Sequence, residues 1–260
     1  MSTHPAFADT LRGEWIKFRS LRSTWLTLGG LVVIGLGITV LSADASVASY
    51  PTATVEERQD WDPTNRSLLM YMVAQLVIGV LGILVVTSEY ATGLMQTSLS
   101  ATPRRHRLLG AKVAVVTAVA VVSGQVLMLT SFLIGQARFV ASGLPYATLD
   151  DPRALSAVVG GGLYLAVIGL LTVGLGTIMR ATAGALATLV GIVLLVPPLA
   201  DLFPWLDGLF AFWPTLGGAA VMETVVNPDH PHPWLNLAGM GAGALAVLAV
   251  AFVLFERRDV

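Results

Sequence analysis

A short polar segment near the carboxyl-terminal end of the chain holds the residues best suited to metal chemistry. His230 and His232 flank a proline, and Asp229 directly precedes them. Two imidazoles and a carboxylate bind zinc when a fold brings them together at tetrahedral geometry. The prolines in and around this segment instead predict a stiff, extended loop. Metal binding is therefore the weaker alternative, and we assign no metal ligand.

The sequence lacks the motifs of common enzyme sites. It contains no G-x-x-x-x-G-K-[ST] and no G-x-G-x-x-G, which indicates that the chain does not itself hydrolyse ATP or bind a dinucleotide. It contains no G-x-S-x-G nucleophile motif and no cysteine, which excludes a thiol nucleophile, a disulfide and a thiolate-bound metal. We therefore assign no catalytic residue and no cofactor to this chain.

The composition indicates the environment in which the polar residues must act. Hydrophobic residues make up 55% of the 260 residues and charged residues only 12%, about half the charged share of soluble domains. The 15 basic and 16 acidic residues nearly cancel, so the bulk charge does not favour a nucleic-acid partner. These proportions are typical of an integral membrane protein.

Six charge-free windows are long enough to cross a bilayer, which requires about 20 mostly apolar residues per helix. They cover residues 23–43, 67–88, 113–137, 154–179, 181–200 and 233–255. None alternates strictly between apolar and polar residues, so helices fit and a barrel does not. The sequence therefore predicts an all-α integral membrane protein with six transmembrane helices in a single domain over residues 1–260.

A further uncharged stretch, residues 208–222, is too short for a span. It carries four residues that suit a membrane surface or a bend, namely Phe210, Phe212, Trp213 and Pro214. We therefore expect a re-entrant or interfacial element before the last span.

The distribution of basic residues between the loops predicts the orientation. If the amino terminus is cytoplasmic, eleven basic residues lie on the inner side and four on the outer side. The inner ones are Arg12, Lys17, Arg19, Arg22, Arg104, Arg105, Arg107, Lys112, Arg180, Arg257 and Arg258, and the outer ones are Arg58, Arg66, Arg138 and Arg153. Because basic loops tend to stay on the cytoplasmic side, we expect both termini in the cytoplasm.

Residues 5–19 have the pattern of a helix that lies on the membrane surface. Four apolar residues recur at spacings of four, four and three, which places them on one helical face. These residues are Phe7, Leu11, Trp15 and Phe18. Lys17 and Arg19 fall largely off that face, so the rings would enter the cytoplasmic leaflet while the cations stay near lipid phosphate. The alternative is that this helix only anchors the topology of the chain and has no further role.

The connection between the second and third windows, residues 88–107, contains helix-boundary signals. Glu89 could begin a short helix, because a carboxylate is favourable near a helix amino terminus, and Gly93 would permit a bend. Thr102 and Pro103 match a helix cap followed by proline at the first helical position. The cations that follow are Arg104, Arg105 and Arg107. In a first helical turn their charges oppose the helix dipole. Their presence there would be explained either by membrane topology and anionic lipid or by an acidic groove on a partner protein.

The six windows contain no Asp, Glu, Lys, Arg or His, which weighs against a proton-coupled carrier. Gln75 and Gln125 are candidates for lining a path through the membrane, although such neutral groups more often bond between helices. Gly239 and Gly243 form a G-x-x-x-G pattern, which favours either packing within the chain or self-association.

Three segments resemble a known family. Residues 14–25, E-W-I-K-F-R-S-L-R-S-T-W, are similar to the amino-terminal segment of ABC-2 type transporter permeases, especially those of high-GC Gram-positive bacteria, the actinobacteria. Residues 87–93, T-S-E-Y-A-T-G, followed by P-R-R at 103–105, resemble the first cytoplasmic loop of that family. The ending F-E-R-R-D-V at 255–260 is similar to its usual carboxyl terminus.

The resemblance implies a transmembrane permease subunit of an ATP-driven exporter in a bacterial plasma membrane. Such a subunit pairs with a second permease, identical or paralogous, and with two cytoplasmic ATP-binding-cassette ATPase subunits that hold ATP and Mg²⁺. It also implies that the first cytoplasmic loop docks on the ATPase. The residues carried over to that role are Glu89, Tyr90, Thr92, Gly93, Pro103, Arg104, Arg105 and Arg107.

Three other functions stay open at this point. A membrane scaffold or immunity protein could share the fold and transport nothing. A membrane enzyme would need a polar cluster at one face, which only residues 229–232 offer. A secondary carrier would depend on a proton gradient rather than on ATP.

Overall fold

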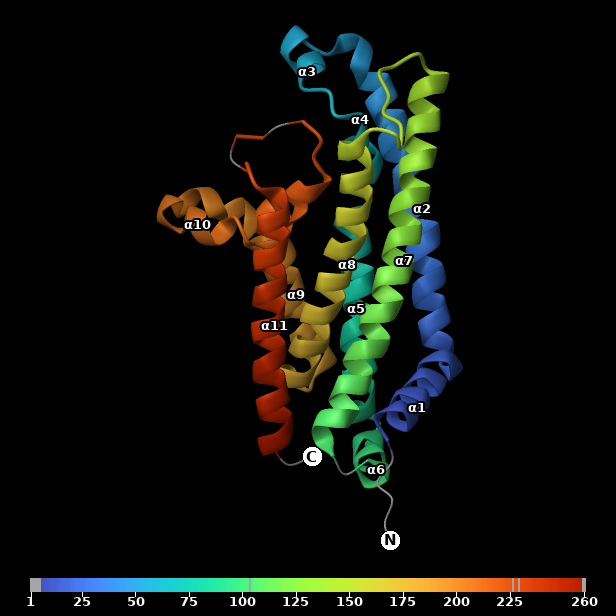
Figure 1. The fold of residues 1–260 in the computed structure, drawn as a ribbon, viewed down its shortest axis with the longest axis vertical. Coiled ribbons are helices and arrows are strands. Elements are labelled where there is room, and N and C mark those ends of the chain that lie inside the picture. The colour runs from blue at the N-terminus through green and yellow to red at the C-terminus, as the bar shows by residue number, and fades with distance from the viewer. Residues whose placement is uncertain (1–5, 103, 226, 229, 259–260) are drawn as a thin grey trace.

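The computed structural model describes residues 6–102, 104–225, 227–228 and 230–258. All regular secondary structure in this part of the chain is helical, which confirms an all-α fold. Within it, five helical stretches are long and apolar enough to cross a membrane. They are α2 (Arg22–Ser49), α5 (Tyr71–Ala91) preceded by α4 (Pro63–Leu68), α7 (Arg105–Ala141), α8 (Pro152–Met179) and α11 (Pro233–Arg257). These helices lie side by side in one elongated bundle (Figure 1).

Shorter helices lie at the two ends of the bundle (Figure 1). α1 (Phe7–Ser20) and α6 (Leu94–Ala101) lie at the end where α11 finishes. η1 (Tyr50–Thr52) and α3 (Val55–Gln59) lie at the opposite end, in the connection between α2 and α4. The two connections that were predicted to be cytoplasmic, before α2 and between α5 and α7, therefore share one end of the molecule.

The fifth predicted window, residues 181–200, does not form one continuous spanning helix. α9 (Thr182–Val190) widens into the π turn η2 (Gly191–Leu195), which is followed by the 3₁₀ helix η3 (Pro197–Leu202). The two prolines at 197 and 198 lack amide hydrogens and clash with the preceding turn, so the α-helix cannot continue through them. The prediction of six continuous spans is not confirmed, because the apolar helix here is shorter than 18 residues.

The chain between α9 and α11 leaves the bundle sideways and returns (Figure 1). Its short helices are η4 (Pro204–Leu206), α10 (Asp207–Phe210), η5 (Pro214–Gly218) and η6 (Ala219–Met222). Trp213 Nε1 donates a hydrogen bond to the backbone oxygen of Ile192 at 2.7 Å. This bond anchors the lateral segment to η2 and gives a partner to a carbonyl group near the end of a helix. A membrane re-entry by residues 208–222 stays a prediction.

α8 is the central helix, and glycines allow its neighbours to approach it. In its most apolar stretch 78% of the residues are buried, against 22% for α2. A Cβ atom on Gly82 of α5 would overlap Thr172 of α8, and one on Gly124 of α7 would lie 3.1 Å from the backbone oxygen of Gly162. Small residues at such crossings let membrane helices pack backbone to backbone.

The two glycines of the G-x-x-x-G pattern in α11 have different surroundings. A Cβ atom on Gly239 would overlap the ring of Phe212 from the lateral segment, so this glycine serves packing within the chain. Gly243 has no other atom within 4 Å of the position that a Cβ would take. The packing interpretation therefore holds at Gly239, and self-association through Gly243 stays a prediction.

Candidate functional site

α1 packs against α7 at the end of the bundle that carries α6. The residues that it turns inward are Thr10, Glu14 and Phe18, all of them buried. Of the other predicted apolar residues, Leu11 is half-buried, whereas Phe7 and Trp15 are each 45% exposed. The predicted apolar face is thus divided between the protein and its surroundings, because Glu14 takes an inward position between Thr10 and Phe18.

Glu89 lies in the last turn of α5, not at the start of a new helix as the sequence suggested. A carboxylate at this end of a helix opposes the helix dipole. Glu89 is nevertheless only 8% exposed, so its charge requires compensation by nearby cations. Lys112 of α7 and Lys17 of α1 supply it.

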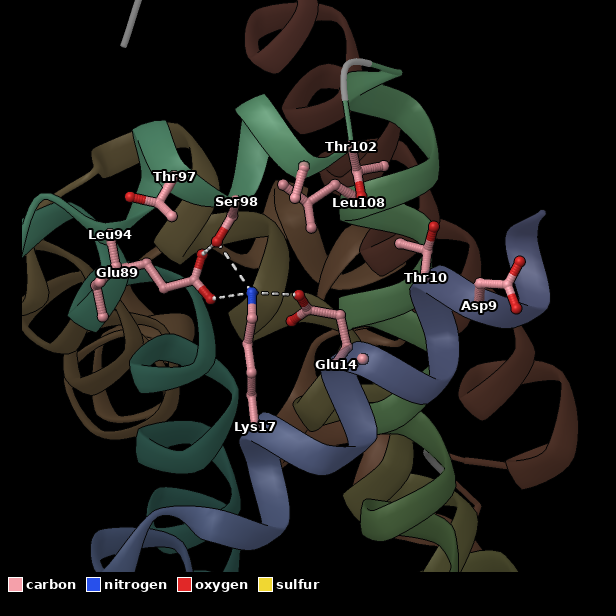
Figure 2. A pocket seen from close by; sticks show the side chains of 12 residues that line it. Asp9, Thr10, Glu14, Lys17, Glu89, Leu94, Thr97, Ser98, Thr102 and Leu108 are labelled. Atoms are coloured by element: carbon pink, nitrogen blue, oxygen red, sulfur yellow. Dashed lines mark hydrogen bonds and ion pairs between the residues drawn. The ribbon is translucent and has the colours of Figure 1, made fainter. Parts of the chain in front are cut away.

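These residues form a charge cluster, which we define as Glu14, Lys17, Glu89, Ser98 and Lys112. Lys112 Nζ lies 2.8 Å from Glu14 Oε2 and 2.7 Å from Glu89 Oε1. Lys17 Nζ lies 2.7 Å from Glu14 Oε1 and 3.2 Å from Glu89 Oε1. It also donates a hydrogen bond to Ser98 Oγ at 2.9 Å, and Figure 2 shows these partners converging on the lysine.

The charge cluster joins four helices through groups whose charges balance. Glu14 and Lys17 come from α1, Glu89 from α5, Ser98 from α6 and Lys112 from α7. The side chain of Lys112 is only 2% exposed, and a buried charge is tolerated when it is paired and hydrogen-bonded. A movement of any one of these helices must therefore displace charged or polar partners on the others.

Lys17 lies at the open side of the cluster, where its side chain is 45% exposed. Burial lowers the pKa of Lys17, but the hydrogen bond and charge of Glu14, together with those of Glu89, outweigh burial and raise that pKa above its usual value. Lys17 therefore stays protonated at physiological pH. Beside it, a cavity of about 360 Å³ opens between α1 and α6, with Asp9 and Thr97 on its walls (Figure 2).

Gly93 sets the direction in which α6 leaves α5. Its φ of 72° lies in the left-handed region that glycine adopts without steric cost, and it directly precedes α6. This is the bend that the sequence predicted. α6 then buries Met95 and Ser98 and leaves Leu94 54% exposed. Leu94 lies one turn before Ser98 on the same side of α6 and lines the cavity beside the charge cluster.

The two residues predicted beside Gly93 are held by local contacts. Thr92 Oγ1 donates a hydrogen bond to the backbone oxygen of Ser88 at 2.8 Å. Arg180 Cζ, from the end of α8, lies 5.2 Å from the ring centre of Tyr90, within the range of a cation–π interaction. Thr92 and Tyr90 thus stabilise the junction between α5 and α6.

α7 begins at Arg105, and Arg104 takes the cap position. The predicted cap at Thr102 is corrected, because Thr102 is instead the cap residue that follows α6, and Pro103 lies outside the described residues. Arg104 is exposed and Arg107 is half-buried. The predicted cations are thus near the start of α7, but they do not share one environment.

Arg105 forms hydrogen bonds within the chain, and its contact with a partner or lipid stays a prediction. Its Nη1 donates hydrogen bonds to the backbone oxygens of Phe255 at 3.1 Å and of Arg258 at 2.6 Å. The carbonyl groups at the carboxyl terminus of a helix lack helical partners and favour a cation there. Arg105 therefore fastens the start of α7 to the end of α11.

The two predicted path-lining amides both bond between helices. Tyr164 of α8 donates a hydrogen bond to Gln75 Oε1 of α5. Gln125 Nε2 of α7 donates to the backbone oxygen of Val159 of α8 at 2.8 Å. These contacts agree with the packing interpretation, and a role in lining a path stays a prediction.

The suggested metal segment receives no support from neighbouring ligands. Asp229 lies outside the described residues, and His230 Nδ1 lies 3.4 Å from the side-chain nitrogen of Asn236. Across the described ranges, no three side chains of His, Asp or Glu converge as a metal site.

Sequence reasoning missed Glu14, Ser98 and Lys112 as site residues. The sequence places Glu14 only in a family-like segment and Lys112 only among the basic residues of the cytoplasmic loops. One signal was present for Lys112, since apolar residues surround it and a buried lysine requires an anionic partner. The identity of that partner was not readable from the sequence.

Comparison with known proteins identifies the family of the chain. The sequence profile of the ABC-2 family transporter proteins matches residues 10–197, a range that contains the whole charge cluster. No curated protein and no solved structure gives a significant match. Because the matched range covers well over half of the sequence and the fold is a bundle of apolar helices, the chain belongs to the ABC-2 transporter family of membrane proteins.

Proposed function

We propose that the chain is the permease subunit of an ATP-driven exporter and forms part of the substrate path. Members of the ABC-2 family normally work with an ABC ATPase, and this sequence has no nucleotide-binding motif of its own. In this proposal two cytoplasmic ATPase subunits hold ATP and Mg²⁺, and a second permease copy or paralogue completes the path. The membrane is a bacterial plasma membrane, with both termini on the cytoplasmic side.

The charge cluster is the observation that carries this proposal. α6 is short and lies at one end of the bundle, where a partner outside the membrane can reach it. A partner that displaces α6 moves Ser98, which contacts Lys17 and Glu89 directly. Lys112 extends the connection to α7, the longest helix of the bundle. A push on α6 would therefore reach α1, α5 and α7 together.

The exposed side of α6 that borders the cavity, with Leu94 and Thr97, is the proposed docking surface for the ATPase. Replacing Leu94 with glutamate puts a charge on an apolar contact, so we expect the ATPase to dissociate. A central interface residue contributes about 2 kcal/mol or more, which corresponds to roughly thirtyfold weaker binding. The measurement is Mg-ATP hydrolysis by the chain after affinity purification from native membranes, and Leu94→Glu should reduce it to background.

Val55→Glu is the matched control for this experiment. Val55 is 75% exposed in α3, at the opposite end of the bundle. This variant should retain the co-purified hydrolysis of the unmodified chain. If Leu94→Glu retains as much hydrolysis as Val55→Glu, the ATPase does not dock on α6.

The proposed orientation predicts a labelling pattern. The chain contains no cysteine, so a single introduced cysteine reports one position without background. His106 lies near the α6 end of α7 and Ser142 at its opposite end, and both are exposed. In intact cells a membrane-impermeant maleimide should label Ser142→Cys but not His106→Cys, and disrupted membranes should allow both. The reverse pattern in intact cells would contradict cytoplasmic termini.

A further inference from the structure

An apolar groove runs along the outside of the bundle between α1, α2 and α7. It encloses about 460 Å³. Its walls include Trp15 of α1, Trp25 and Val32 of α2, and Val122 and Val126 of α7. Each of these side chains is at least 45% exposed, so the chain itself leaves the groove open.

The groove has about the length of one leaflet of a bilayer. Along α7 it extends from Ala118 to Thr130, which corresponds to about 18 Å at the rise of an α-helix. Half of the hydrocarbon core of a membrane measures about 15 Å. The groove therefore matches an acyl chain that belongs to a single leaflet.

Two cations lie at the end of the groove nearest to α1. Arg19 lines the groove, and Arg22 begins α2 directly beyond the turn. Both side chains are exposed, and among the described residues neither guanidinium has a hydrogen-bond or ion-pair partner. Trp25 Nε1 donates a hydrogen bond to the backbone oxygen of Arg19 at 2.9 Å, which fixes the turn between the two helices.

We propose that this groove binds one anionic phospholipid. Its acyl chain lies between α2 and α7, and its phosphate group accepts charge-assisted hydrogen bonds from Arg19 and Arg22. Trp15 and Trp25 stand where tryptophan is enriched in membrane proteins, at the boundary between acyl chains and headgroups. The lipid would hold α1 against α2 and α7, and α1 is the helix that supplies Glu14 and Lys17 to the charge cluster.

Charge favours this occupant over a second copy of the chain. A two-fold interface presents the same patch from both copies, so an interface centred on the mouth of the groove would bring identical arginines together. Like charges that face each other destabilise an interface. A phosphate group, in contrast, accepts charge-assisted hydrogen bonds from both arginines and offsets part of their charge.

The test uses the full-length chain purified in a neutral detergent. Phosphatidylglycerol and phosphatidylcholine with identical acyl chains are added separately, and binding is measured by native mass spectrometry and by the midpoint of thermal unfolding. We expect phosphatidylglycerol to bind more tightly and to raise the midpoint further. A basic side chain near a membrane surface contributes about fivefold in binding to anionic lipid, so Arg19→Gln combined with Arg22→Gln should weaken phosphatidylglycerol binding by roughly 25-fold.

Arg12→Gln is the matched control. Like Arg19→Gln alone, it removes one positive charge from α1, but it lies seven residues from Arg19, about 10 Å along α1, and does not line the groove. This variant should keep most of the preference for phosphatidylglycerol. Val122→Trp fills the groove at an exposed position, so it should lower the binding of both lipids while the chain remains folded.

Three results would overturn the proposal. Equal binding of the two lipids by the unmodified chain would remove the role of the arginines. An equal loss with Arg12→Gln and with Arg19→Gln alone would indicate general attraction to anionic surfaces. A change of oligomeric state with Val122→Trp, measured by light scattering, would show that a second copy occupies the groove.

Discussion

Replacing Lys112 with methionine is expected to lower the free energy of unfolding by about 3–5 kcal/mol, the cost of removing one partner from a buried ion pair. The substitution keeps an unbranched side chain of similar length but leaves Glu14 and Glu89 without their buried cation. These side chains are 6% and 10% exposed, so water compensates them poorly. The measurement is denaturant-induced unfolding of the purified chain in detergent, followed by circular dichroism.

Lys17→Met is the matched control, because Lys17 contacts the same two glutamates but its side chain is 45% exposed. Lys17→Met should lower the free energy of unfolding clearly less than Lys112→Met does. Adding Glu14→Gln and Glu89→Gln to Lys112→Met should restore part of the loss, because the uncompensated charges are removed as well. Equal losses for Lys112→Met and Lys17→Met would contradict the assignment of Lys112 as the buried centre of the cluster.

Gly82→Ala is expected to destabilise the bundle by about 1–3 kcal/mol, the usual cost of overpacking. The added Cβ would overlap Thr172 Oγ1 and lie 2.9 Å from the backbone oxygen of Gly169, so α5 and α8 must separate. Because α8 is central, this displacement spreads to the whole core. The midpoint of thermal unfolding in detergent should fall accordingly.

Gly37→Ala provides the control on another apolar helix. A Cβ on Gly37 of α2 has no neighbouring atom within 4 Å, and alanine favours a helix over glycine by up to about 1 kcal/mol. This variant should therefore be neutral or slightly more stable than the unmodified chain. Combining Gly82→Ala with Thr172→Ala should recover part of the loss. A Gly82→Ala variant as stable as Gly37→Ala would show that the α5–α8 crossing is looser than described.

Most of the spanning helices could be predicted because long charge-free runs decide membrane insertion locally. The windows 23–43, 67–88, 113–137, 154–179 and 233–255 each lie within one observed helical span. The window at 181–200 does not form one continuous helix, because Pro197 and Pro198 interrupt it. A count of apolar residues takes no account of these prolines. Proline hardly changes the mean hydropathy of a window, but it lacks the amide hydrogen that a helical hydrogen bond requires.

The charge cluster was much harder to predict, because it depends on tertiary contacts. Glu14 and Lys112 are 98 positions apart in the sequence, and no local pattern links them. The aromatic spacing of α1 correctly predicted a helix but not which face meets the protein. Spacing could not show that Glu14 would be buried while Trp15 stays exposed, because a partner on α7 decides that choice.

The most direct test of the account measures whether the chain needs a separate ATPase. The chain is purified from its native membrane with its partners, and half of the preparation is then stripped of them before both halves are reconstituted in lipid vesicles. We predict Mg-ATP hydrolysis by the intact assembly, background hydrolysis by the stripped chain, and recovery when the ATPase is added back. Hydrolysis by the stripped chain at the rate of the intact assembly would contradict the central claim.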